Sequence, residues 1–313
     1  MPTYPLFHTV LCPIDFSKHS AQALAHAAAL VKRLGGRLIV IYVEDPLLVA
    51  AAAMAYDEKL MRDKARAELR RFVEKNIRHY GIPIGSVTID VAVGKPYDEI
   101  EWAADRLKCD LIVLGSAGET GANRMMFGST TLRVLRRSPL PVLAIPPVRG
   151  RITRPAGNWP GPWALAPIDL GASAHADAMA AAVSARELDA RLRLVHVVEP
   201  VPERPWIEVD ARRRNRQRQR RAMARLASLK DELSWGVTDT IVQTGKPGRE
   251  IAKVAASSQV GLVVMTRRRG QGLLGPRQGS ISYQVLLDAR TPVLALPSDK
   301  QWLRRAAALR PRK

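Results

Sequence analysis

Cysteine is nearly absent from this chain of 313 residues, which contains only Cys12 and Cys109. The two thiols form neither a C-x-x-C pair nor the spacing of a metal site, which excludes a disulfide-rich scaffold and a cysteine-based metal cluster. Each cysteine lies in or beside an apolar segment that looks like a strand. We therefore expect both thiols to be reduced and buried in a cytosolic protein.

Long apolar runs are also missing. The longest, "PLLVAAAAMAY" at 46–56, is too short to cross a bilayer. The first residues, "MPTYPLFHTVLCPIDF", lack the basic region and long apolar segment of a secretory signal. These absences predict a cytoplasmic protein without a transmembrane segment. The 47% hydrophobic and 25% charged residues that are present predict a packed globular chain, long enough for two domains.

Positive charge is abundant and unevenly spread, with a formal net charge of +20. Residues 1–150 contain 20 Lys and Arg against 15 Asp and Glu, whereas the remainder contains 29 against 14. Such an excess suggests an anionic partner. Nucleic acid, a phosphorylated ligand and a membrane surface all remain open as that partner.

The chain repeats itself once. The segment "LCPIDFSKHSAQALAHAAAL" at Leu11 returns as "LAPIDLGASAHADAMAAAV" at Leu165, an offset of 154 residues. Further on, "VAVGKPYDEIEWAA" matches "IVQTGKPGREIAKVAA", and "SPLPVLAIP" matches "ARTPVLALP", with an offset of 151. An ordered repeat of this length predicts two homologous domains. We place them at 1–149 and 163–298, joined by a linker rich in Pro and Gly at 150–162 and followed by a basic tail at 299–313.

Within one copy, apolar strand-like runs alternate with helical patterns. The predicted strands of the first copy cover 8–14, 37–43, 87–93, 110–115 and 141–145, and the helices cover 17–34, 57–79, 96–107 and 129–137. The strands are rich in Val, Ile and Leu throughout, as expected when helices cover both faces of a sheet. The fold class is therefore α/β, with an open, parallel, doubly wound sheet in each domain. Ligands of such folds bind beyond the carboxyl ends of the strands.

A glycine-rich stretch, "GSAGETGANRMMFGST", follows the fourth predicted strand and leads into a helix. Gly115 and Gly118 lack a Cβ and would let a ligand approach the backbone. Gly128 and Ser129 open a helix, whose free N–H groups and positive dipole end favour a phosphate. Arg124 would supply a mobile countercharge.

Simpler interpretations stay open for each of these residues. The glycines can form an ordinary turn, Ser129 can be a helix N-cap, and Asp15 can cap the helix that begins near Ser17. Arg124 can be a solvated surface residue. The "GKP" at 94–96 does not fit a Walker A motif, and we expect Pro96 near the first position of its helix.

The spacing G-x2-G-x9-G-[ST], with the accompanying "PID", "YVED" and "PVLAIP", resembles the ATP-binding signature of the universal stress protein family. The resemblance extends over nearly the whole chain, twice. It implies two tandem Rossmann-like domains (adenine nucleotide α hydrolase-like), each a five-stranded sheet of order 3-2-1-4-5 with ATP across the strand ends, accompanied by Mg²⁺. It also implies an internal pseudo-dimer of the two domains and a homodimer of the chain. The ATP-binding residues would be Pro13, Ile14, Asp15, Val43, Leu114, Gly115, Gly118, Arg124, Gly128, Ser129, Thr130 and Thr131.

The second copy departs from this pattern in its loop "TRRRGQGLLGPRQGS". Thr266 stands in the place of Gly115, and Arg269 in the place of Gly118. We therefore expect one competent and one degenerate nucleotide site. The degenerate site would comprise Asp169, Val197, Thr266, Arg269, Gly279 and Ser280, where the arginines bind another anion or fill the pocket themselves.

No set of residues for ATP turnover is apparent, because Asp15 is the only carboxylate that the motif places well. We expect a nucleotide-dependent regulatory protein rather than an enzyme, with slow ATP hydrolysis as an alternative. The segment 212–225, "RRRNRQRQRRAMAR", contains eight arginines and no acidic residue. It is an alternative site for nucleic acid or another polyanion, or for an anionic membrane with Trp302 and Leu303 of the tail. The third interpretation is an exposed Arg-rich helix that forms ion pairs with another domain or subunit.

Overall fold

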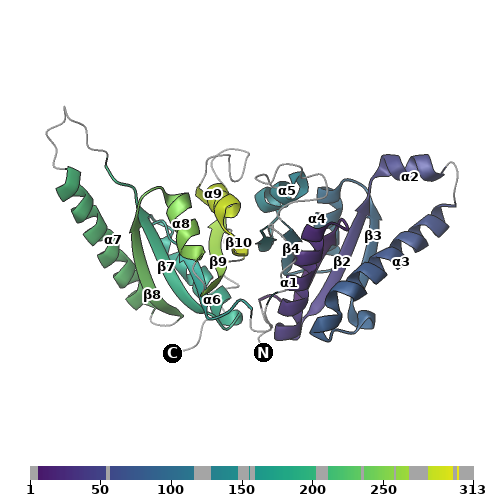
Figure 1. Cartoon of the computed structure of the whole chain (residues 1–313), viewed down its shortest axis with the longest axis horizontal. Helices are drawn as coiled ribbons and strands as arrows, with labels where there is room; N and C mark the ends of the chain where they lie inside the picture. The colour runs from purple at the N-terminus through teal and green to yellow at the C-terminus, as the bar shows by residue number, and fades with distance from the viewer. Residues whose placement is uncertain are drawn as a thin grey trace. The chain divides into compact units, whose positions relative to one another are not determined.

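The computed structural model describes residues 6–53, 57–115, 128–146, 155, 159–201, 211–233, 236–256, 259–267, 281–298 and 302. The chain divides into two compact units, Met1–Trp159 and Pro160–Lys313 (Figure 1). Each unit is an α/β domain with an open sheet, as the sequence predicts. No helix within the described ranges is long and apolar enough to span a membrane.

Within the described residues of the first unit, five parallel strands lie in the order β3-β2-β1-β4-β5. Cys12 of β1 lies opposite Val40 of β2, and Leu11 lies opposite Ile112 of β4. The strands are β1 (Thr9–Ile14), β2 (Arg37–Glu44), β3 (Thr88–Val93), β4 (Leu111–Gly115) and β5 (Val142–Ile145). This order confirms the predicted 3-2-1-4-5 topology of the domain.

Helices connect these strands and cover the sheet. They are α1 (Lys18–Leu34), α2 (Pro46–Ala53), α3 (Glu58–Ile77), α4 (Pro96–Arg106) and α5 (Ser129–Arg137), with short 3₁₀ turns η1 (Arg78–Tyr80) and η2 (Ile84–Ser86). Helices α1 and α3 contact each other, as do α4 and α5. Right-handed crossovers put the two pairs on opposite faces, because the chain reverses its direction across the sheet after β3.

Local chemistry sets the helix bounds. Helix α1 begins after Ser17, whose hydroxyl accepts a hydrogen bond from the N–H of Ser20, and ends at Gly35 in the left-handed conformation (φ 63°). A glycine C-cap of this kind carries no Cβ penalty. Pro96 lies in the first turn of α4, as predicted, where its missing N–H is not needed.

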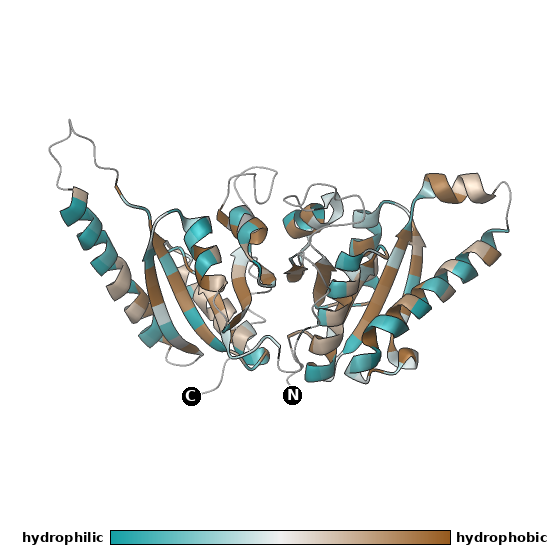
Figure 2. Cartoon of the chain, in the orientation of Figure 1, coloured by the Kyte–Doolittle hydropathy of each residue, from teal (hydrophilic) through white to brown (hydrophobic). Residues whose placement is uncertain are grey.

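The second unit repeats this arrangement in the order β8-β7-β6-β9-β10. Its strands are β6 (Trp163–Pro167), β7 (Arg191–Val198), β8 (Val237–Thr244), β9 (Val260–Arg267) and β10 (Val293–Pro297). Its helices are α6 (Ala174–Glu187), α7 (Ala211–Leu233), α8 (Pro247–Ala255) and α9 (Ile281–Asp288). In both units the central strands β1, β4, β6 and β9 are largely apolar, whereas the longest outer helices, α3 and α7, are largely hydrophilic (Figure 2).

The core of the first unit lies where β1 and β4 meet α1. Leu11, Leu24 and Ile112 are all fully buried there. Cys12 and Cys109 are buried and reduced, as predicted. The edge strand β3 differs from the expectation that helices cover both faces, since its residues are half-buried or exposed. An edge strand has only one neighbour, so solvent reaches more of its surface.

Candidate nucleotide site

The first strand of the first unit ends in a tight turn before α1. Ile14 is buried, whereas Pro13 and Asp15 are partly exposed. The Oδ1 atom of Asp15 accepts a hydrogen bond from the N–H of Ser17 at 3.0 Å, and the hydroxyl of Ser17 accepts one from the N–H of Ser20 at 3.1 Å. The N-cap of α1 is therefore Ser17, and the alternative that Asp15 is the cap is wrong. Asp15 thus holds the turn through its Oδ1 atom.

Phe16 lies in this turn with a positive φ of 61°, a conformation that a bulky residue seldom adopts. Its ring makes edge contacts with Tyr42 of β2 at 4.8 Å and with Phe72 of α3 at 5.3 Å between ring centroids. These contacts hold the residue in its strained conformation and so fix the direction of Asp15. Sequence reasoning missed Phe16, because an aromatic residue beside a motif gives no signal of its backbone conformation.

The second strand ends beside the first. Val43 pairs with Ala92 of β3 and is partly exposed, so its backbone lies at the carboxyl edge of the sheet. The carbonyl of the next residue, Glu44, accepts a hydrogen bond from Gly94 at 3.1 Å. Burial raises the pKa of Glu44, and the nearby Arg62 opposes that shift. The end of β2 is thus joined to the turn that follows β3.

The fourth strand ends at Gly115, after the buried Leu114. A Cβ on Gly115 would lie 2.7 Å from the carbonyl oxygen of His19 in the first turn of α1. The glycine is therefore required by the close packing of β4 on α1. This differs from the prediction that its missing Cβ admits a ligand. The carbonyl of Gly115 accepts a hydrogen bond from the hydroxyl of Thr131 at 2.8 Å.

Helix α5 begins at the same end of the sheet. Its N-cap is Gly128, so Ser129 occupies the first helical position and the alternative that Ser129 is the N-cap is wrong. Ser129 is exposed, Thr130 is partly exposed and Thr131 is buried with its hydroxyl bonded to Gly115. The first N–H groups of a helix have no partner within it, and they carry its positive dipole end. Gly118 and Arg124 lie outside the described residues.

These features meet at one edge because parallel strands place their carboxyl ends together. Asp15 follows β1, Val43 lies near the end of β2 and Gly115 ends β4, and β2 and β4 are the two neighbours of β1. The bond from Thr131 fixes the start of α5 beside the end of β4. The result is a partly exposed carboxylate, the partly exposed end of β2 and a helix N-terminus at the point where the strand order reverses.

At the corresponding end of the second unit, side chains of β9 and α6 bond to each other. The hydroxyl of Thr266 donates to Oδ1 of Asp177 at 2.7 Å, and the hydroxyl of Ser173 donates to Oδ2 at 2.8 Å. Asp177 is buried on the first turns of α6. Asp169 is exposed and Val197 pairs with Gln243. The remaining residues of the predicted degenerate site, Arg269, Gly279 and Ser280, lie outside the described ranges.

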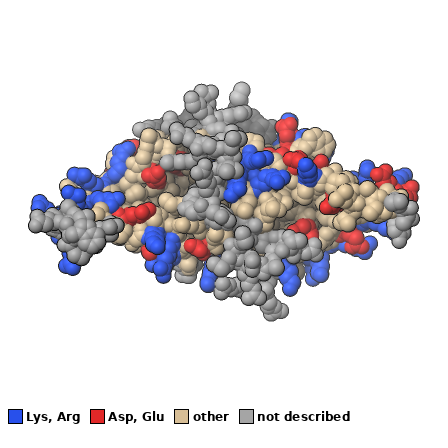
Figure 3. All heavy atoms as spheres, turned by 90° about the horizontal axis from the view of Figure 1, so that it is seen from above, with Lys and Arg blue, Asp and Glu red and all other residues tan. Residues whose placement is uncertain are grey.

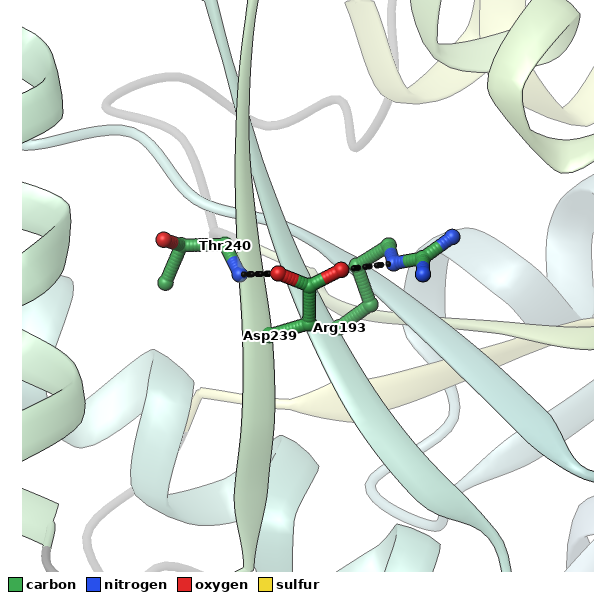
Figure 4. A network of polar contacts seen from close by, with 3 residues as sticks. All are labelled: Arg193, Asp239 and Thr240. Atoms are coloured by element: carbon green, nitrogen blue, oxygen red, sulfur yellow. Dashed lines mark hydrogen bonds and ion pairs between the residues drawn. The ribbon is translucent and has the colours of Figure 1, made fainter.

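A second polar network of this unit lies within the sheet (Figure 4). The Nε atom of Arg193 on β7 donates to Oδ2 of Asp239 on β8 at 2.8 Å, and Oδ1 of Asp239 accepts from the N–H of Thr240 at 2.7 Å. The guanidinium of Arg193 also lies 4.3 Å from the ring centroid of Trp163 on β6. The network therefore joins three neighbouring strands. It lies near the amino-terminal ends of these strands, away from the carboxyl edge of the sheet.

Metal binding and nucleophilic catalysis by cysteine have little support among the described residues. They contain no group of three His, Cys, Asp or Glu side chains arranged to hold a metal ion. Burial raises the pKa of the Cys109 thiol to about 12 and that of the Cys12 thiol further, so neither is a ready nucleophile. Burial lowers the pKa of His26 to about 4, although its bond to the carbonyl of Gln22 opposes the shift.

Comparison with known proteins gives one consistent result. The model of the universal stress protein family matches residues 6–146 and 164–297. A universal stress protein of Methanocaldococcus jannaschii is 30% identical over 144 residues, which cover 45% of this chain and 82% of that protein. One of Thermus aquaticus is 30% identical over 143 residues, covering 45% of this chain and 99% of that protein. The crystal structure of a universal stress protein from Archaeoglobus fulgidus has the same fold, with a TM-score of 0.63, 18% identity and coverage of 93% of this chain and 99% of the other.

Proposed function

Because the chain belongs to the universal stress protein family, we propose that its first unit binds ATP and that the protein is a nucleotide-dependent regulator of a stress response. The observation that carries this proposal is the meeting of three strand ends with the start of α5. In the first unit this edge coincides with the intact spacing Gly115, Gly118, Gly128 and Ser129. The second unit retains only the last glycine and serine of that spacing.

Each part of the edge has a role in the proposed complex. The Oδ2 atom of Asp15 accepts hydrogen bonds from the ribose or the adenine, and the backbone at Val43 contacts the adenine. The N–H groups at Ser129 and Thr130 bind the phosphates, since a helix N-terminus favours anions. Thr131 positions this terminus through Gly115 and does not use its hydroxyl on the phosphate. Arg124 supplies countercharge from the loop.

In the proposed complex, a divalent ion would bind to the nucleotide rather than to a cluster of protein side chains. The described residues offer no cluster of three acidic or imidazole ligands. We therefore assign Mg²⁺ to the phosphates of the nucleotide, where it would neutralise part of their charge. In the second unit the bond between Thr266 and Asp177 occupies the place of Gly115, which supports a single nucleotide per chain.

Calorimetric titration with Mg-ATP tests this assignment. The wild-type chain is expected to bind one equivalent. Gly118→Arg, which introduces the arginine of the second copy, is expected to abolish binding. The reciprocal change Arg269→Gly is the matched control and is expected to leave one equivalent bound. Equal binding by the wild type and Gly118→Arg, or no binding by the wild type, would contradict the site.

The same preparation tests the regulatory role against slow hydrolysis. A regulator is expected to release phosphate from ATP at the rate of a no-protein control. If release exceeds that rate and is lost in the double variant Asp15→Ala, Ser129→Ala, the first unit is an ATPase. That result would support nucleotide binding at this site but would contradict a purely regulatory role without hydrolysis.

A further inference from the structure

Helix α7 presents arginine side chains to solvent along its first half. The helix packs on its unit through one apolar face, formed by Ala211, Ala222, Leu226, Leu229 and Leu233. Every arginine from 212 to 225 is exposed. In Figure 3, Lys and Arg side chains mark the left end, over α7, whereas basic and acidic side chains mix at the right end, over α3. We call the exposed arginines at 214, 216, 218, 220 and 221 the arginine surface.

The arginine surface is held in place by the segment that follows β7. The side chain of Asn215 accepts from the N–H of Val201 at 2.8 Å and donates to its carbonyl at 3.3 Å. Arg218 donates to the carbonyl of Glu199 at 2.7 Å. These bonds join the first half of α7 to the segment after β7. The arginines therefore project from a fixed helix rather than from a free tail.

The density of this charge matches a nucleic-acid duplex. Five arginines lie between Arg214 and Arg221, over a helical rise of about 11 Å, or roughly one charge per 2 Å. Duplex DNA carries one negative charge per ~1.7 Å of its axis. The segment 212–225 contains no acidic side chain, and Arg225, which pairs with Glu232 of the same helix at 3.2 Å, lies outside the arginine surface.

The fold itself does not require this charge. Helix α3 occupies the same place between the second and third strands of the first unit, and it mixes both signs of charge. Arg71 pairs there with Glu68 at 3.0 Å, for example. Two homologous helices on the same scaffold thus differ in charge, which indicates that the basic helix serves a purpose other than covering the sheet.

A membrane is the less suitable partner for α7. Helices that lie on a membrane bury an apolar face in the lipid, whereas the apolar face of α7 is buried in its own unit. Met223 is the one large hydrophobic side chain exposed along α7. Trp302, which the sequence suggested as a membrane contact, is itself buried, with 7% of its surface exposed, and Leu303 lies outside the described residues.

We propose that the arginine surface binds the phosphate backbone of duplex nucleic acid, independently of base sequence. Helix α7 contains no aromatic residue, which removes the stacking platform that single-strand binding uses. The arginines contact phosphates on both sides of a groove, because they extend around the exposed part of the helix. This activity is separate from the nucleotide site of the first unit.

The test is fluorescence anisotropy with a labelled 30-base-pair DNA duplex at several salt concentrations. The full chain is compared with a variant in which Arg214, Arg216, Arg220 and Arg221 are changed to Gln. We expect this variant to bind at least about ten-fold more weakly at 100 mM salt. The slope of log K against log salt should fall by about 3 to 4, since each phosphate contact contributes ~0.9.

Two control variants separate local from general effects. Changing Arg304, Arg305, Arg310 and Arg312 to Gln removes the same charge from the tail and is expected to leave most of the binding. Changing the four α7 arginines to Lys is expected to retain the binding and the salt slope. Circular dichroism confirms that each variant is folded.

Several results would overturn the proposal. They are a wild-type chain that does not bind the duplex at 50 mM salt, an equal loss in the tail variant, and tighter binding to the single strand than to the duplex. Binding to phosphatidylserine vesicles without binding to the duplex would assign the arginine surface to a membrane instead.

Discussion

Gly115 shows that one residue of a binding motif can be required for a reason unrelated to the ligand. Its position after a buried strand predicts close approach by a nucleotide. In the structure its missing Cβ makes room for the backbone of His19 in α1. The two requirements can be separated by experiment, because packing affects the stability of the apo protein whereas ligand contact affects only affinity.

Gly115→Ala is expected to destabilise the protein by about 1–3 kcal/mol, the usual cost of forcing a group into a packed space. The new methyl group would lie 2.7 Å from a backbone oxygen that cannot move without shifting α1. Urea unfolding without nucleotide measures the effect. Gly85→Ala is the control, since a Cβ at Gly85 meets nothing within 4 Å. Equal stability of the two variants would show that α1 can shift to make room for the new methyl group at little cost in free energy.

His26 predicts a pH dependence of stability. Burial lowers the pKa of its imidazole to about 4, so between that pH and the ordinary value of 6.5 the unfolded chain binds a proton that the folded chain does not. Stability should therefore fall as the pH decreases from about 6.5 toward 4, by up to about 3 kcal/mol. Urea unfolding at pH 7, 6 and 5 measures this loss.

His26→Gln should make the curve shallower between pH 7 and 5, because the titrating group is gone. His175→Gln, at an exposed position on α6, is the control and should retain the wild-type slope. The assignment fails if both variants retain the full pH dependence. The absolute stability of His26→Gln is not the readout, since its side chain also packs edge-on against Trp159.

At the scale of elements, the sequence predicted most of the helices and strands, because the apolar runs and the turn residues indicate the same element boundaries. Helix α5 has the predicted bounds, since Gly128 precedes it and Ser138 follows it. Helix α2 was missed. Its residues, "PLLVAAAA", form no amphipathic pattern and none is buried, so periodicity contains no signal for it. Burial of β3 was overestimated because apolar composition does not distinguish an edge strand from a central one.

The sequence predicted where the candidate site lies, because strand ends and glycine spacing indicate its location, but it did not predict the hydrogen bonds within the site. The pairing of β1 with β2 and β4 brings Asp15, Val43 and Gly115 to one edge, as predicted. The bonds within that edge could not be read from sequence. The hydroxyl of Thr131 donates to the carbonyl of Gly115, and the hydroxyl of Ser17 caps α1. Several hydroxyl groups lie near each position in the sequence, and only the local backbone geometry determines which of them forms the hydrogen bond.

In the second unit, a side-chain hydrogen bond links Thr266 of β9 to Asp177 of α6. Thr266→Val removes the hydroxyl that Asp177 accepts from, at nearly constant volume. We expect a loss of about 1–3 kcal/mol, the cost of removing a donor from a buried polar group. Thermal unfolding measures this change, and Thr244→Val, at an exposed position, is the control. An unchanged midpoint in Thr266→Val would mean that the bond contributes nothing to the packing of the second unit.

At the scale of the whole molecule, each unit has the length of a complete relative, since the protein from Thermus aquaticus matches 45% of this chain over 99% of its own length. The first unit extends to Trp159, which the sequence placed in the linker. The ring of Trp159 packs on His26 at 5.2 Å between centroids, and its carbonyl accepts a bond from Arg33 at 3.0 Å.

A fragment of residues 1–159 is therefore expected to fold alone and to bind Mg-ATP with the affinity of the whole chain. A fragment of residues 1–149 lacks Trp159 and should unfold at a lower temperature. Calorimetry measures both properties. Identical unfolding temperatures for the two fragments would show that the contacts of Trp159 add no stability. Loss of binding in a folded 1–159 fragment would mean that the second unit takes part in the site.

The three-residue difference in length between the copies falls between their second and third strands, the segment that carries α2 and α3 in one unit and α7 in the other. The helices of this segment also differ in charge: α3 contains seven Lys and Arg against four Asp and Glu, whereas α7 contains nine against two. Length and charge therefore differ between the copies in this crossover, while the strands on either side pair in the same register, Ile39 with Thr88 in one unit and Arg193 with Asp239 in the other. A change confined to this crossover can alter the outer surface of a unit without moving the ends of its strands.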